Sequence, residues 1–220
     1  KEISVELTRE FNLERDQTIE DMKSILFYLG FLTISRSSLE SIKLKIPNYA
    51  IRTLYFDYFR MLLLKKETFE LPVSQIKDSI EEIALTGKIE PFVSAVTGIM
   101  KKMSFRDSIG FTEKSLKMIF LSYLMLSKAY YVKSEYEVAE GYVDIALFKR
   151  FKEVKFEAMI ELKYIPRNKY TDENFEKKKK EAEEQLLKYS KNEEFRKVEN
   201  LKKFAIIFVG DEASICEVSE

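Results

Sequence analysis

The sequence predicts an α/β (α+β) protein in which a mixed sheet is flanked by helices and preceded by a mostly helical region. In the first 104 residues the apolar side chains recur mainly at helical spacing. From residue 105 onward, a helical segment is followed by three strand-like segments, a long charged helix and two further strands. Three consecutive strands and a helical crossover imply both antiparallel and parallel neighbours. We therefore expect two domains, 1–104 and 105–220.

The helical region is punctuated by glycines and one short hairpin. A first helix is expected before Gly30, because Gly commonly follows the end of a helix. Its apolar positions at helical spacing are Ile19, Met22, Ile25, Leu26 and Leu29. Alternating apolar residues in 31–48 predict a hairpin, and Gly87 is expected to end a later helix. The further helices are expected at 49–66, 72–87 and 89–103.

The sheet domain is predicted to begin with an apolar helix after Thr112, whose hydroxyl suits an N-cap. Short runs rich in β-branched and aromatic residues then predict strands. The expected strands are 131–138, 142–149, 156–163, 204–210 and 213–218. A charged helix, roughly 172–197, lies between the third strand and the fourth.

Missing residue types exclude several kinds of chemistry. The chain has no His and a single Cys, so Ser-His-Asp catalysis, His-ligated zinc and internal disulfides are excluded. We interpret that residue, Cys216, as a structural part of a late strand. Lys and Arg total 37, as do Asp and Glu, and the zero net charge argues against a strongly basic nucleic-acid coat.

No apolar run approaches the roughly 20 residues that a membrane-spanning helix needs. None of the six glycines forms a phosphate-binding loop motif. A reducing cytoplasm fits the single Cys. The chain begins at Lys1, and we expect it to be part of a longer protein. An enzyme built from this composition would use carboxylates, Lys, Arg, Tyr or Ser/Thr, together with a hard metal ion.

The strands 142–149 and 156–163 carry the strongest chemical signal. If they form a hairpin centred between residues 152 and 153, Asp144 lies directly opposite Glu161. The aliphatic residues of both strands then face the same core, so register and side-chain parity agree. Lys163, two residues beyond Glu161, points to the same side of the sheet.

Two carboxylates that face each other repel unless a cation lies between them. Mg²⁺ and Mn²⁺ prefer oxygen ligands, typically one or two carboxylates completed by water and substrate phosphate. Lys163 could orient or deprotonate the attacking water and neutralise charge on the phosphate. Two carboxylates and a lysine are thus a sufficient set for metal-assisted hydrolysis of a phosphodiester.

These residues resemble a known family. Asp144 followed by the segment 161–163, Glu-Leu-Lys, is similar to the D…(D/E)-x-K signature of the PD-(D/E)XK nuclease superfamily, which includes restriction-endonuclease-like folds. Glu137 upstream of Gly141 resembles the acidic residue in the family's E…G..D pattern. One departure is Tyr142, where such proteins often have an Arg that could contact phosphate.

The resemblance extends over roughly residues 20–215. Gln185 and Tyr189 are similar to the Gln and Tyr of a helix that often follows the E-x-K strand. The predicted αβββαβ order is that of the restriction-endonuclease-like core, although Val143 stands where a Pro is common. The subgroup that the chain resembles is the C-terminal nuclease-like domain of bacterial AAA-ATPase-like proteins, which implies an ATPase-like domain upstream.

The resemblance implies a cytoplasmic, metal-dependent nuclease that hydrolyses nucleic-acid phosphodiester bonds, with DNA favoured over RNA as the partner. The implied catalytic residues are Asp144, Glu161, Lys163, Glu137 and Gln185. The cofactor would be Mg²⁺ or Mn²⁺, held by Asp144, Glu161 and the carbonyl of Leu162. Lys163 would position the attacking water.

Other interpretations of the acidic and polar residues stay open. Asp144, Glu161 and Lys163 could form a solvated sheet face that contains a Glu–Lys pair. Glu135 is a rival of Glu137 for the same role, and Gln185 could be an ordinary helix-surface residue. The domain could also bind nucleic acid without cleaving it, or act only as a protein-interaction module.

Three further segments have competing interpretations. The run Lys177–Lys180 is interpreted as a solvated helix face rather than a nucleic-acid contact. By position alone, Arg167 and Lys169 are better candidates for a phosphate contact. The aromatic segment Tyr55–Phe59 is interpreted as core rather than as a base-stacking surface.

Overall fold

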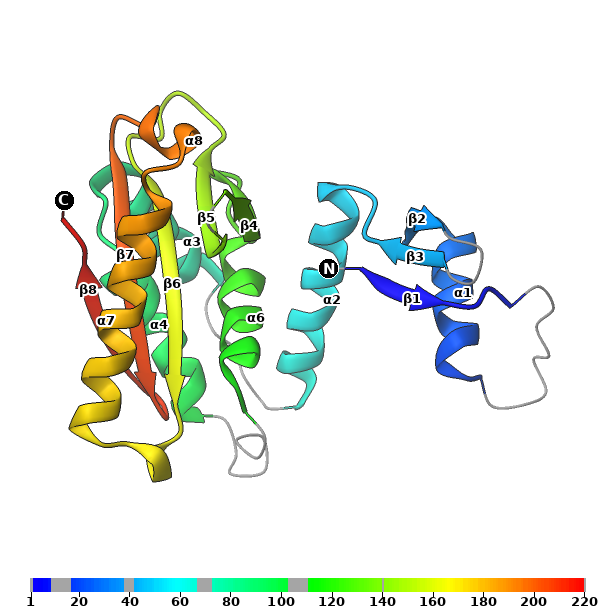
Figure 1. The fold of residues 1–220 in the computed structure, drawn as a ribbon, viewed down its shortest axis with the longest axis horizontal. Coiled ribbons are helices and arrows are strands. Elements are labelled where there is room, and N and C mark those ends of the chain that lie inside the picture. Colours follow the sequence, from blue (N-terminus) through cyan, green and yellow to red (C-terminus); the bar gives the residue numbers. More distant parts are fainter. Residues whose placement is uncertain are drawn as a thin grey trace. The chain divides into compact units, whose positions relative to one another are not determined.

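The computed structural model describes residues 2–8, 17–37, 42–66, 73–102, 111–139 and 141–219. They group into two compact units, Lys1–Tyr58 and Phe59–Glu220, and the helix α2 (Tyr49–Lys66) contains the boundary. Figure 1 shows the elements of both units. The division into functional domains near residue 104 stays a prediction.

The first unit contains a three-stranded antiparallel sheet in the order β1-β3-β2. Its elements are β1 (Ile3–Val5), α1 (Ile19–Tyr28), β2 (Thr33–Ser37) and β3 (Ile42–Lys45). The hairpin predicted for residues 31–48 is therefore confirmed. Gly30 lies just past the end of α1 with φ of 79°, a conformation that Gly adopts without strain.

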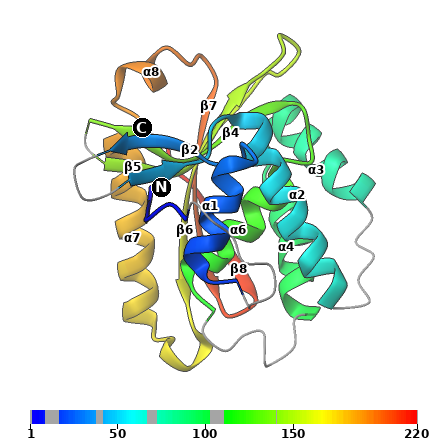
Figure 2. The same ribbon diagram turned by 90° about the vertical axis from the view of Figure 1, so that its right-hand side faces the viewer.

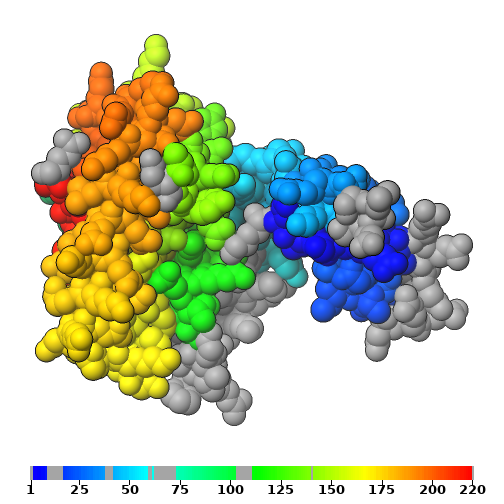
Figure 3. All heavy atoms as spheres, viewed as in Figure 1, coloured from blue at the N-terminus to red at the C-terminus, as the bar shows by residue number. Residues whose placement is uncertain are grey.

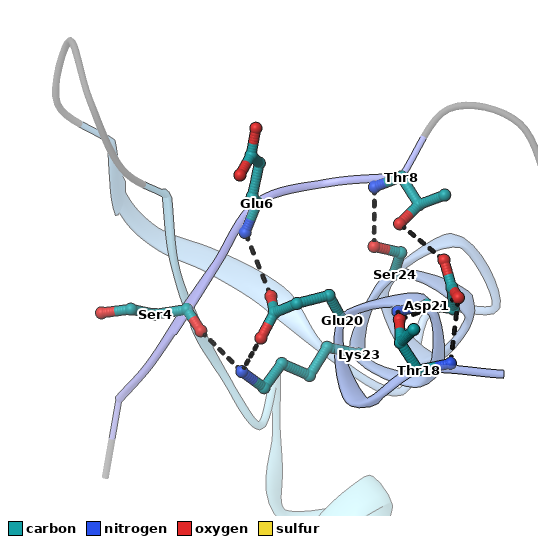
Figure 4. Close-up of polar contacts among 8 residues, drawn as sticks. All are labelled: Ser4, Glu6, Thr8, Thr18, Glu20, Asp21, Lys23 and Ser24. Atoms are coloured by element: carbon teal, nitrogen blue, oxygen red, sulfur yellow. Dashed lines mark hydrogen bonds and ion pairs between the residues drawn. The ribbon is translucent and has the colours of Figure 1, made fainter.

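None of the apolar residues at helical spacing in α1 is fully buried, although Leu26 packs against the core of this unit. The buried residues of this helix are Asp21 and Ser24, whereas Ile19 and Met22 are exposed. The segment after β1 runs beside the helix, so that Thr8 N–H donates to Ser24 Oγ (2.9 Å) and Thr8 Oγ1–H donates to Asp21 Oδ1 (2.9 Å) (Figure 4). The polar face is buried because it supplies partners to backbone and hydroxyl groups that leave water.

The helices before the sheet of the second unit lie where the sequence predicts. They are α3 (Val73–Thr86), α4 (Glu90–Lys102) and α6 (Glu113–Leu124). Gly87 follows α3 with φ of 77°. Thr112 caps α6, and its hydroxyl accepts a hydrogen bond from the N–H of Ser115.

The second unit is built on a five-stranded sheet in the order β4-β5-β6-β7-β8, in which the β6–β7 pair is parallel and the other pairs are antiparallel. Its strands are β4 (Tyr130–Val138), β5 (Gly141–Lys149), β6 (Glu157–Ile165), β7 (Leu201–Val209) and β8 (Glu212–Glu217). The predicted α/β (α+β) class and the restriction-endonuclease-like αβββαβ order are confirmed.

A helical crossover joins β6 to β7. It consists of the short 3-10 helix η1 (Arg167–Lys169) and the helix α7 (Asp172–Tyr189). The prediction that this helix extends to residue 197 is wrong, because it ends at Tyr189 and Asn192 caps a separate short helix, α8 (Glu193–Arg196).

Helices cover both faces of the five-stranded sheet (Figure 2). On one face, Leu186 of α7 lies in the same buried cluster as Ile207 of β7. On the other face, the rings of Phe120 of α6 and Phe208 of β7 pack edge to face, 6.0 Å apart. Side chains of α7 and α8 form a continuous surface over the first of these faces (Figure 3). Because β6 is covered on both sides, all of its residues except Tyr164 are buried.

Two structural interpretations made from the sequence are supported. Phe56 is buried and the ring of Tyr55 packs against Phe31, as expected for core residues, although Tyr58 is exposed. Cys216 of β8 packs, partly buried, against the cluster beneath α7. Within the described ranges, none of the helices is both long enough and apolar enough to cross a bilayer.

Candidate active site

The candidate site lies where the β5–β6 ladder ends. The predicted register is confirmed, since Ile145 pairs with Ile160 and Leu147 pairs with Ala158. Beyond the pair Ile145–Ile160, hydrogen bonds from side chains to the backbone replace those between the two backbones. Asp144 N–H donates to Glu161 Oε1 (3.2 Å), and the N–H of the residue after Glu161 donates to Asp144 Oδ2 (3.0 Å). The two carboxylates therefore reach between the diverging strands and bond to the opposite backbone.

The backbone at Leu162 faces the same opening. Its N–H is the group that bonds to Asp144. In an extended strand the N–H and the C=O of one residue point toward the same neighbouring strand. The Leu162 carbonyl is thus directed toward β5, the strand that carries Asp144, as the third oxygen ligand expected from the sequence would be.

A third carboxylate, Glu135, lies in the same cross-strand row. In the β4–β5 pair, Ser134 is opposite Ile145 and Tyr136 is opposite Val143, so Glu135 falls opposite Asp144. Glu135 has φ of 48°, a left-handed conformation that non-glycine residues rarely adopt. Such strain tends to persist where the surroundings enforce it, often at functional sites.

A lysine that the sequence analysis missed enters this row from α6. Lys117 Nζ lies 2.5 Å from Asp144 Oδ1 and 3.7 Å from Glu135 Oε1. The sequence did contain a signal for it, because Lys117 is the only charged residue in the apolar stretch 116–126. A charge in such a stretch is costly to bury unless it is paired.

The predicted lysine of the E-x-K segment lies beside its glutamate. Lys163 Nζ is 3.7 Å from Glu161 Oε2, and both residues are buried, with 7% and 2% of their surfaces exposed. Asp144 and Glu161 thus each use one oxygen for a backbone N–H and present the other to a lysine. Asp144 faces Lys117, and Glu161 faces Lys163.

Burial dominates the electrostatics of the site. It raises the pKa of Glu161 to about 8, with the negative charge of Asp144 acting in the same direction and Lys163 opposing it. Burial works to lower the pKa of Lys117, but the hydrogen bond and charge of Asp144, together with Glu135, leave that pKa raised. Ionising both acids at once is therefore unfavourable in this buried site, while Lys117 keeps its proton.

Gln185 and Tyr189 of α7 lie above this end of β5. Tyr189 Oη accepts a hydrogen bond from the backbone of Tyr142, and it also forms a hydrogen bond with the side chain of Gln185. Burial and the charge of Glu161 raise the pKa of Tyr189. Gln185 Oε1 is buried, and within the described part of the chain it has no hydrogen-bond partner. A buried acceptor of this kind is suited to a water or another donor that the site takes up.

The other predicted functional residues lie away from these contacts. Glu137 is exposed and pairs with Tyr142 in the β4–β5 ladder, so the rival Glu135 is the acid near Asp144. Arg167 forms ion pairs with Asp211 and Glu212. In the lysine run, Lys178 pairs with Glu181 and Lys180 pairs with Glu184, which supports the solvated-face interpretation.

The chemistry of the oxygen set fits a hard divalent cation in part. Asp144, Glu161 and the Leu162 carbonyl supply oxygen donors at one opening, as Mg²⁺ prefers. Burial and the charge of Asp144 raise the pKa of Glu161, and a cation would offset both effects. In the ranges that the structure describes, no three acidic side chains converge closely enough to hold a metal by themselves. Water and substrate would therefore supply the remaining ligands.

The fold and the site together define a nuclease-like class, with a mixed sheet that carries two acids and a lysine at a ladder end. The family model that matches the sequence is that of the PD-(D/E)XK nuclease superfamily, over residues 111–218. This part of the chain belongs to that superfamily. No curated protein matches the sequence significantly.

Proposed function

We propose that the chain is a metal-dependent nuclease that hydrolyses phosphodiester bonds of nucleic acid, with DNA favoured over RNA. The observation that carries the proposal is the convergence of Asp144, Glu161 and Lys163 at the open end of the β5–β6 ladder. This residue set is sufficient for metal-assisted hydrolysis and needs no His.

The ion would be Mg²⁺ or Mn²⁺, with Asp144, Glu161 and the Leu162 carbonyl as its protein ligands. When bound, such an ion stabilises charge on the phosphate and favours ionisation of water. Lys163 holds its ammonium group beside Glu161, where it orients the attacking water and offsets negative charge. The buried Gln185 Oε1 accepts a hydrogen bond from a water in the site.

Lys117 adds a role that the sequence analysis did not predict. While Asp144 has no other cation near it, Lys117 neutralises the carboxylate. With an ion held by Asp144 and Glu161, the ammonium group of Lys117 would be available to contact a phosphate oxygen of the substrate. Glu135 keeps Lys117 close to the site in both situations.

The test is cleavage of single- and double-stranded DNA and RNA in Mg²⁺, Mn²⁺ or EDTA. Lys163→Ala and Asp144→Ala should each lower the rate by about 100-fold or more, since positioned acid–base and electrostatic groups contribute at least that much. Lys155→Ala, an exposed lysine just before β6, is the matched control. Undiminished cleavage by both site variants would show that the activity arises elsewhere.

A second candidate function is nucleic-acid binding without cleavage. The ion pair between Lys117 and Asp144 favours it, because that pair already supplies the positive charge that a metal would bring. This function predicts salt-dependent binding and no cleavage in any divalent metal. An ATPase-like partner domain in the same protein and a cytoplasmic setting rest on the sequence resemblance alone.

A further inference from the structure

We propose that the second unit has a phosphate-binding pocket, separate from the candidate active site, at the end of the sheet where β6 and β7 begin. Its anchor is Lys203 of β7. The ligand class is a phosphate group, either free or carried by a nucleic acid. The inference does not depend on whether the candidate active site cleaves nucleic acid.

Lys203 has a buried aliphatic stem, and its ammonium group reaches the cavity described below. Only 6% of its surface is exposed. It pairs with Met159 and lies on the same face of β7 as Ala205 and Ile207, which belong to the cluster beneath α7. Within the described residues, its side chain has neither an ion pair nor a hydrogen bond. An ammonium group that no carboxylate of the described residues neutralises, at the wall of a cavity, is available to bind an anion from outside the chain.

A cavity of about 530 Å³ adjoins Lys203. Its walls come from the end of α7, from α8, from the start of β7 and from the end of β8. Ser190, Arg196 and Asn200 contribute polar groups to these walls. The volume is ample for a tetrahedral oxyanion with its bridging waters.

The charge balance of the cavity is positive. Lys202 and Glu217 both line it, but their side chains pair with each other at 2.6 Å and cancel. The charges that remain on the lining are those of Lys203 and Arg196 against Glu199. An ammonium and a guanidinium group, with hydroxyl and amide donors between them, suit the several oxygens of a phosphate better than a single carboxylate.

The pocket is distinct from the candidate active site. On β7, Glu161 pairs with Ala205. Lys203 lies two residues before Ala205, about 7 Å away along the strand. No residue lining the cavity is an acid or a lysine of the candidate active site. Variants here should therefore change anion binding without removing a metal ligand.

The first experiment is a ¹H–¹⁵N NMR titration of the whole chain with sodium phosphate at constant ionic strength, with chloride as the reference. We expect saturable shifts at the amides of residues 200–204. Lys203→Met, which keeps the aliphatic stem, should weaken binding about tenfold. The control Lys197→Met removes an exposed lysine that pairs with Glu193 and should leave the affinity unchanged.

Arg196→Gln is a second variant, and because Arg196 is exposed, its loss should not disturb the core. It should weaken phosphate binding severalfold. If Lys203→Met fails to fold, the affinity of Arg196→Gln for phosphate still tests the proposed pocket. Unchanged affinity in the folded variants, or shifts confined to other residues, would overturn the proposal.

The source of the phosphate is distinguished by competition in EDTA between inorganic phosphate and short DNA oligonucleotides with a 5′-phosphate or a 5′-hydroxyl. Preference for the 5′-phosphate indicates a terminal phosphate, and equal competition by both indicates the backbone. Binding of inorganic phosphate alone indicates a free ligand. Absence of saturable binding by all three probes contradicts the pocket.

Discussion

Replacing Glu161 with glutamine should stabilise the folded protein at alkaline pH and have little effect in acid. The pKa of Glu161 is raised from its ordinary value of 4.5 to about 8 by burial and by the charge of Asp144. Below pH 4.5 the folded and unfolded chains both hold this proton. Between these two pKa values only the folded chain keeps it, so the free energy of unfolding falls as pH rises.

This decrease in the free energy of unfolding should be complete above about pH 8. A pKa raised this far corresponds to a destabilisation on the order of 4 kcal/mol. Glu161→Gln keeps the shape of the side chain and cannot ionise, so its advantage over the original chain should grow by that amount between pH 5 and pH 9. Urea denaturation in EDTA at a series of pH values measures this difference.

The matched control is Glu157→Gln, another buried glutamate of β6, whose carboxylate accepts a hydrogen bond from Lys149 N–H. This variant should show no comparable gain at alkaline pH. Mn²⁺ should also stabilise the original chain at pH 9 and stabilise Glu161→Gln less. An advantage of Glu161→Gln that is the same at pH 5 and pH 9 would refute the reasoning.

Two further predictions follow from the same site. Lys117→Gln should tighten Mn²⁺ binding severalfold in a calorimetric titration, because it removes a competing cation. The control Lys114→Gln replaces an exposed lysine one turn away and should have no effect. Weaker Mn²⁺ binding by Lys117→Gln would mean that Lys117 supports the metal site. Gly141→Ala should destabilise the fold by about 2 kcal/mol in urea denaturation, because its Cβ would lie 2.7 Å from Tyr189 Oη at φ of 150°. Tyr189→Phe should recover part of that loss, and full stability of Gly141→Ala would contradict this contact.

The sequence was sufficient for the strand order and for the central pair of acids. A hairpin loop between two strands of alternating pattern has few symmetrical registers, and the one that buries both aliphatic stripes also aligns Asp144 with Glu161. The same logic applied to β4–β5 places Glu135 opposite Asp144, since Val138 pairs with Gly141. The preference for Glu137 followed a family pattern instead of this register.

The features that the sequence did not reveal depend on packing between elements. Lys117 reaches Asp144 only because α6 docks beside β4 and β5, and periodicity within a helix does not state which strand it meets. In α1 the apolar spacing was a misleading guide, because Asp21 and Ser24 satisfy the polar groups of Thr8. Local pattern identifies the elements, and long-range hydrogen bonding decides which face is covered.

The two lysines and three carboxylates at the ladder end have a consequence for binding order. Together Lys117, Lys163, Asp144, Glu161 and Glu135 sum to a charge of −1 when all are ionised. Adding a divalent ion would leave an excess of one positive charge in a largely buried site, which the single negative charge of a phosphodiester offsets. Each ligand should therefore raise the affinity for the other, and by thermodynamic reciprocity the two effects must be equal.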